Sequence, residues 1–192
     1  YAGNVFSDIP NPMGKLHRNK DNKDKKSRLV GNLYAELHLF DGFMFKTSFG
    51  ADYNNLYRRS FSPKYDEINA SEKLSGLSNR NAWNFNWVFT NTLNYTKTFG
   101  DHTINALLGL ESLRNRYEYF TASRDGFPSD DPNFHFLDAG DVGTQKNSGS
   151  ATEYSMVSYF GKIDYNYHDR YLVAFTLRRD ATAASSPRSG AT

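Results

Sequence analysis

The 192-residue chain contains no cysteine, which excludes disulfide bridges and thiolate metal sites. It also lacks any apolar run of the roughly 18 residues that a membrane-spanning helix needs. The mean hydropathy is -0.71 and the formal net charge is only +2. Such a balanced charge does not favour binding to nucleic acid. The chain does not begin with Met and has no apolar leader, so we expect a mature or internal piece of a protein.

Recognisable catalytic or cofactor motifs are missing as well. There is neither a nucleophile-elbow sequence nor a glycine-rich phosphate loop. The five histidines are scattered, and no two stand at helical ligand spacing: His17, His38, His102, His135 and His168. The sequence therefore predicts no enzyme, no metal site and no cofactor.

What the chain does have is aromatic residues, with 15 Phe and 13 Tyr, and a period-two pattern. Between Arg28 and Asp52, apolar residues alternate with polar ones on both sides of Asp41-Gly42. Side chains of a strand alternate between two faces, and Asp-Gly favours a hairpin. The pattern predicts two strands, each with one apolar and one polar face.

The same alternation recurs in four further stretches: 83–96, from 103 onward, 154–167 and 171–180. The expected connections are alternately short and long, the long ones covering about 53–81 and 114–153. Short turns at one end and long loops at the other are typical of outer-membrane barrels, whose apolar face meets lipid. Strands of about 14 residues also exceed the usual length in soluble domains.

Several segments in this order resemble the barrel of SusC/RagA-like TonB-linked outer-membrane transporters. They are Gly31–Tyr53 (GNLYAELHLFDGFMFKTSFGADY), Asn91–Asp101, Asp125–Pro128 with Leu137-Asp138-Ala139, and Ser158–Asp180 (SYFGKIDYNYHDRYLVAFTLRRD). The resemblance implies an importer of glycans or peptides in the outer membrane of a Gram-negative, Bacteroidetes-like bacterium. It also implies outer-membrane lipid, a SusD-like surface lipoprotein and the TonB complex as partners, the TonB contact lying outside this chain.

The expected fold is an all-β, antiparallel, up-and-down transmembrane β-barrel segment of about six strands. Residues 1–27 are expected to form an extracellular loop segment, residues 28–180 a partial barrel, and residues 181–192 an unpatterned tail. Neither a plug domain nor a TonB box is recognisable, and the tail departs from the family pattern after Asp180. Six strands cannot close around a lumen, so we expect this chain alone to be unable to transport.

Two groups of site residues follow from this interpretation. Aromatic residues in the long loops are expected to contact the ligand: Tyr57, Tyr65, Phe127 and Phe134. Polar residues on the strands are expected to face the lumen: Glu36, Lys46, Asn84, Asn86, Glu111, Lys162 and Asp164. Two alternatives remain open, a soluble β-sandwich that binds carbohydrate, in which the apolar faces would meet one another, and an outer-membrane lipase.

Overall fold

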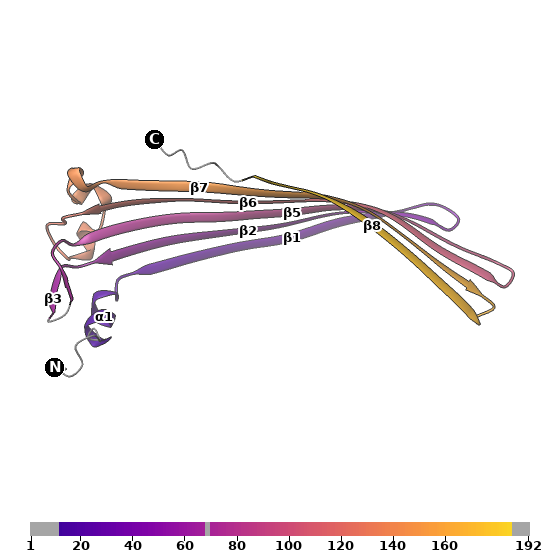
Figure 1. Ribbon diagram of the computed structural model, residues 1–192, viewed down its shortest axis with the longest axis horizontal. Helices are drawn as coiled ribbons and strands as arrows, with labels where there is room; N and C mark the ends of the chain where they lie inside the picture. The colour runs from indigo at the N-terminus through magenta and orange to yellow at the C-terminus, as the bar shows by residue number, and fades with distance from the viewer. Residues whose placement is uncertain (1–11, 68–69, 186–192) are drawn as a thin grey trace. The chain divides into compact units, whose positions relative to one another are not determined.

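The structure is a computed structural model that describes residues 12–67 and 70–185. Six long strands account for most of it: β1 (Lys23–Phe40), β2 (Phe43–Ser62), β5 (Gly76–Phe99), β6 (His102–Asp125), β7 (Lys146–Tyr167) and β8 (Tyr171–Ser185) (Figure 1). A short helix, α1 (Pro12–Arg18), precedes them, and β3 (Tyr65–Glu67) pairs with β4 (Ala70–Glu72). Within the described ranges, no helix combines the length and apolar character needed to cross a membrane.

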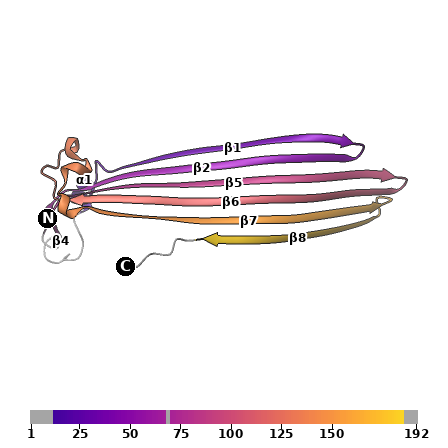
Figure 2. The ribbon, with the colours of Figure 1, turned by 90° about the horizontal axis from the view of Figure 1, so that it is seen from above.

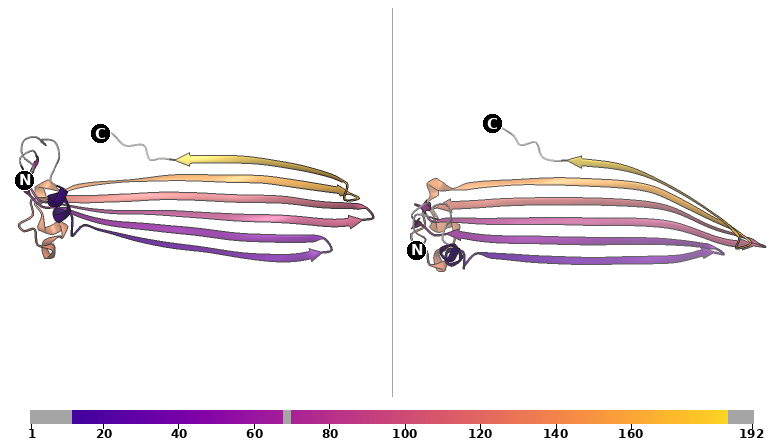
Figure 3. Two further views of the ribbon diagram at one scale, coloured as in Figure 1. Left: turned by 90° about the horizontal axis from the view of Figure 1, so that it is seen from below. Right: turned by 60° about the horizontal axis from the view of Figure 1, so that its bottom comes forward.

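The long strands form one sheet in the order β1-β2-β5-β6-β7-β8, so each pairs with the next long strand along the chain (Figures 2 and 3). This up-and-down topology confirms the predicted arrangement of six antiparallel strands. The pairing of β7 with β8 runs without interruption from Tyr167↔Tyr171 to Glu153↔Ser185. Paired residues point to the same face, so the alternation in both sequences stays in phase along the whole pair.

Tight turns at the predicted positions join the strands at one end. Gly42, after Asp41, has a φ of +80°, which L side chains rarely adopt. A Cβ at Gly42 would lie 2.4 Å from the Thr96 carbonyl oxygen of β5, so glycine is also required for space. The β7–β8 turn places His168 and Asp169 at φ of 55° and 52°.

The strands extend well beyond the apolar alternation, which corrects the two predicted long connections. The connection expected at 53–81 shrinks to residues 63–75, and the one expected at 114–153 shrinks to residues 126–145. Polar residues continue these strands because side chains pair across them: Arg58 binds Asp24, and Asn55 donates to Asn81. Apolar periodicity alone cannot detect a strand that is polar on both faces.

The two expected terminal segments also differ from the structure. β1 begins at Lys23, inside the segment expected to be a loop, and β8 continues to Ser185, inside the expected tail. Ala181 and Ser185 pair with Val157 and Glu153 of β7, so backbone pairing orders this stretch although its small side chains show no pattern. The rest of both segments, residues 1–11 and 186–192, lies outside the described residues.

The described chain divides into two compact units whose boundaries fall inside strands. Unit 1 comprises residues up to 27, 55–83 and 118–150, and unit 2 comprises 28–54, 84–117 and 151 onward. All four buried hydrophobic residues of the described chain lie in unit 1: Phe61, Leu77, Ala82 and Phe127. In unit 2 large apolar side chains are exposed instead, Leu33 to 77% and Leu177 to 65%. A β-sandwich would bury this face, so the exposure argues against the soluble alternative.

Aromatic rings gather at the short-turn end of unit 2. The ring centroids of Phe43 and Tyr95 lie 4.3 Å apart, and those of Tyr167 and Tyr171 lie 6.4 Å apart. The Tyr165 hydroxyl is 2.6 Å from Nδ1 of His102. These residues all lie near the short turns that join β1 to β2, β5 to β6 and β7 to β8.

Candidate functional site

The polar face of unit 2 is a set of side chains that bind one another across the strands. On β1 and β2, Lys46 Nζ lies 2.8 Å from Glu36 Oε1 and 4.7 Å from the centre of the Tyr34 ring. Arg28 makes a bidentate contact with Asp52, at 2.8 and 3.1 Å. All are even-numbered, which confirms that one parity carries the polar residues of these two strands.

Amides cover the polar face of β5 and β6. Asn115 donates from Nδ2 to Asn84 Oδ1 at 2.7 Å and also contacts Asn86 Oδ1. The structure thus brings the two predicted asparagines together through a third that the sequence analysis did not single out. Asn115 has the parity of Glu111 on β6, a signal that could have identified it.

A second polar group, the Arg178 cluster, joins β6, β7 and β8. Arg178 donates to Glu111 at 3.4 Å, to Asp180 at 2.9 Å and to Ser158 Oγ at 3.0 Å. Glu111 also accepts from Thr90 Oγ1 at 3.3 Å. Ser158 is fully buried beneath the guanidinium, so the arginine side chain lies against the sheet.

Beside this cluster, Lys162 pairs with Asp164 on the same strand at 2.8 Å. All seven residues that the sequence predicts for the lumen therefore make polar contacts on this face. Charges of both signs alternate there, which suits a hydrated wall better than an ion-selective one. That the wall faces a lumen remains a prediction.

Three of the four predicted aromatic residues, Tyr65, Phe127 and Phe134, lie in the connections of unit 1. Tyr57 lies on β2 instead, which corrects its expected place in a loop, because that strand continues to Ser62. Phe134 is 48% exposed and Tyr57 is 37% exposed. Tyr65 lies on β3, with the guanidinium carbon of Arg18 3.9 Å from its ring centre. Phe127, by contrast, is only 9% exposed, which corrects the expectation that its ring is available to a ligand.

Phe127 belongs to the loop cluster, which consists of Phe61, Leu77 and Phe127. The Phe61 and Phe127 rings meet edge to face with centroids 5.5 Å apart. Ser75 fixes the start of the loop, because its Oγ accepts from the Phe127 amide at 3.1 Å. The segment 126–145 is thereby attached to the ends of β2 and β5. Its polar sequence does not predict this attachment.

His135 lies on top of the loop cluster. Its ring stacks on Phe61 at 3.6 Å with an interplanar angle of 18°, and it is 4% exposed. Burial lowers the pKa of its imidazole, and the nearby Arg59 charge lowers it further, against the hydrogen bond to the Asp130 carbonyl. His135 therefore favours the neutral form in the folded loop.

Acidic residues of this loop shape its backbone. Asp131 accepts from the Asn133 amide at 2.9 Å and caps the 3₁₀ turn Pro132–Phe134 (η2). Asp141 accepts from the Gly143 amide at 2.8 Å and caps Val142–Thr144 (η4). In the part of the chain that the structure describes, no three His, Cys, Asp or Glu side chains gather as a metal site would require.

An exposed aromatic ring that the sequence analysis missed is Phe136. It is 64% exposed, and the guanidinium carbon of Arg59 lies 5.4 Å from its ring centre. Arg80 lies over Tyr119 in the same way, at 4.2 Å. Together with Arg18 and Tyr65, these make three arginine–aromatic pairs among the described residues of unit 1, which present flat rings and guanidinium donors to a polar ligand.

Both the sequence and the fold of the chain were compared with those of known proteins. No protein-family model matches the chain. TonB-dependent receptor P3 of Formosa agariphila is 30% identical over 92% of the chain, and TonB-dependent receptor SusC of Bacteroides thetaiotaomicron is 24% identical over 92%. The solved RagAB peptide transporter superposes on 88% of the chain with a TM-score of 0.80 at 22% identity. The chain is SusC/RagA-like.

The matched region is a small part of each relative. The SusC/RagA-like chain spans 17% of P3, 17% of SusC and 18% of the solved RagAB chain. The relatives carry the names of receptors and transporters. The resemblance seen in the sequence is thus confirmed, and the fold of the six strands is confirmed with it.

Proposed function

We propose that the SusC/RagA-like chain forms part of the wall of a TonB-dependent outer-membrane importer for glycans or peptides. One observation carries the proposal: the same sheet has a cross-bonded polar face and an exposed apolar face in unit 2. Such a sheet is stable where lipid covers the apolar face and water fills the space beside the other.

The outer strands β1 and β8 support the idea that more strands complete the wall. All 18 residues of β1 and all 15 residues of β8 are exposed. An unpaired strand edge in lipid leaves backbone groups without partners, at several kcal/mol for each group. We infer that both edges pair with strands outside this chain, and that these six strands do not transport alone.

The aromatic residues of unit 1 would contact the ligand from outside the membrane. Tyr57, Tyr65 and Phe134 keep exposed or partly exposed rings, which suit the stacking of sugars or peptide side chains. The likeness to the RagAB peptide transporter supports a peptide as the ligand. A SusD-like lipoprotein partner and coupling to TonB belong to the same proposal.

Fractionation of the complete protein tests the location. It should be found in the outer-membrane fraction and should be released only by detergent. Recovery in the aqueous fraction without detergent would contradict the importer and would favour a soluble carbohydrate-binding module.

Ligand contact is tested by uptake of labelled oligosaccharide and oligopeptide mixtures into cells that express the complete protein. Phe134→Ala and Tyr57→Ala should each raise the half-saturating ligand concentration about two- to tenfold, since one aromatic stack contributes roughly 0.5–1.5 kcal/mol. Phe89→Ala is the matched control, because Phe89 is 40% exposed but lies in the middle of β5, in unit 2. An equal rise of the half-saturating concentration in all three variants would contradict ligand contact by Phe134 and Tyr57.

A further inference from the structure

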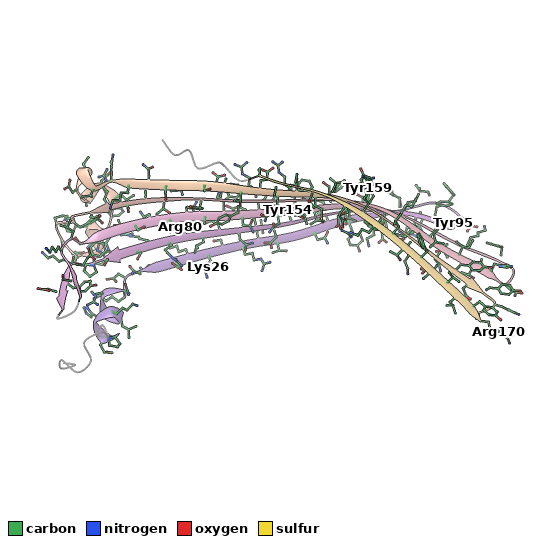
Figure 4. All side chains as sticks on the ribbon, viewed as in Figure 1. Lys26, Arg80, Tyr95, Tyr154, Tyr159 and Arg170 are labelled. Atoms are coloured by element: carbon green, nitrogen blue, oxygen red, sulfur yellow. The ribbon has the colours of Figure 1, made fainter. Side chains whose placement is uncertain are left out.

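A groove crosses the apolar face of unit 2 over β6, β7 and β8. Its volume is about 940 Å³, and its lining is almost entirely apolar, with Leu108, Ile163 and Leu177 among its walls. Tyr159, labelled in Figure 4, borders it from β7. Gly161 leaves the space open, because a Cβ there would lie only 3.3 Å from Cδ2 of Leu108.

One charged residue of the apolar parity lines this groove. Arg179 is two residues after Leu177 on β8 and therefore lies on the same face of the sheet. Its cross-strand neighbour is Tyr159 of β7. No carboxylate among residues 12–67 and 70–185 forms an ion pair with Arg179, whereas the adjacent Arg178 is bound to Glu111 and Asp180 on the opposite face. An arginine without a counter-ion on an apolar surface calls for an anion from outside the chain.

The depth of Arg179 indicates which anion is available, a step that rests on the membrane location proposed above. Tyr171, beside the short turn, stands eight residues before Arg179, about 26 Å along the strand. At a tilt of 35–45°, this rise covers about 20 Å of an apolar band about 25 Å tall. The long arginine side chain spans the remaining few ångströms of the apolar band. Its guanidinium therefore reaches the headgroups of the leaflet opposite the short turns.

We propose that the groove binds a phosphate-bearing membrane lipid, with one acyl chain over Gly161 and the phosphate on Arg179. The methylene chain matches the walls formed by Leu108, Ile163 and Leu177, and a guanidinium binds phosphate through paired N–H donors. The two parts of the ligand thus meet the two kinds of surface that the groove offers.

Lipid binding to the complete, detergent-purified and delipidated protein tests this site, with three probes. Dimyristoyl phosphatidic acid should bind, whereas dimyristoyl glycerol, which lacks the phosphate, and inorganic phosphate, which lacks the chains, should not. Arg179→Gln should raise the half-saturating concentration of phosphatidic acid at least fivefold. Gly161→Leu, which fills the groove, should do the same without removing any charge.

Arg170→Gln is the matched control. Arg170 is an exposed arginine of the same unit, in the turn between β7 and β8 (Figure 4), and its loss should leave lipid binding unchanged. Equal binding to Arg179→Gln and wild type, or equal binding of the glycerol and phosphate forms, would overturn the lipid site. Association of two copies through this face, detected by cross-linking at position 159, would overturn it too. Recovery in the aqueous fraction would instead overturn the proposed function, so the two failures are distinguishable.

Discussion

Phe49 and Lys46 stand three residues apart on β2 and face opposite sides of the sheet. Phe49 is 42% exposed, and its ring lies 6.3 Å from that of Trp87 on β5. Lys46 binds Glu36 of β1. The alternation in the sequence is sufficient to predict this division, because in a strand the parity of a residue decides its face.

Partners on a face are harder to foresee than the face itself. Ser158 and Arg178 were not singled out by the sequence analysis, although both bind within the cluster that holds Glu111. Their contacts depend on the register between β7 and β8, which only the structure fixes. The burial of Phe127 depends in the same way on where its loop folds back.

Phe49→Arg should destabilise the complete protein in a bilayer. Arginine at the midplane on the lipid face costs about 2–4 kcal/mol, whereas near the interface the cost is about 0–1 kcal/mol. Tyr171→Arg, beside the short turn, is therefore the matched control. Denaturant unfolding in lipid vesicles measures both, and equal costs would contradict a lipid-covered apolar face.

His135 should make the loop 126–145 sensitive to acid. Since burial lowers the pKa of the folded imidazole below its ordinary value of about 6.5, the folded loop binds fewer protons than the open loop. The stabilisation is fully present above pH 6.5 and is lost as the pH falls through the folded pKa. Hydrogen exchange of 126–145, corrected for intrinsic rates, should rise over that window.

His135→Phe is the control for this titration. It keeps the stack on Phe61 and removes the ionisable group, so the acid-dependent rise should disappear. The charged groups that surround His135 are Arg59, Asp21 and Asp130. If the rise persisted in the variant, one of these groups rather than the imidazole would be responsible.

At the scale of elements, the six strands show what periodicity can and cannot predict. Their order and their short turns follow from apolar alternation and from Asp41-Gly42. The strand ends next to the long connections cannot be predicted in this way, because polar pairs such as Asp24–Arg58 and Asn55–Asn81 stand there in place of apolar contacts. Two 3₁₀ turns of the second connection, η2 and η4, are equally local, because a single aspartate caps each of them.

The second connection, residues 126–145, should unfold locally when an aromatic side chain of the loop cluster is removed. Phe127→Ala removes a buried aromatic side chain, a change that typically costs about 3–5 kcal/mol in a core. Protease should then cut within 126–145 much faster in the complete protein, as mass spectrometry of the fragments would show. Phe136→Ala removes an exposed ring of the same loop and should stay within about 0.5 kcal/mol of wild type.

At the scale of the whole molecule, the alternation of turns and connections predicts which end faces outward. Protease added to intact cells should cleave the complete protein near Lys73, an exposed residue between β4 and β5. It should spare Lys97, which lies at the short-turn end and binds Asp41 at 2.8 Å. Cleavage at Lys97 alone would invert the proposed orientation, and permeabilised cells provide the control for access.

The unbroken register of β7 with β8 restricts how this part of the gene can change length. One inserted codon in the middle of β8 would turn Phe175 and Leu177, or else Arg178 and Asp180, toward the wrong medium. Two inserted codons would restore the phase beyond the insertion. Viable length variants of this strand should therefore differ by even numbers of residues, unless a bulge absorbs the odd one.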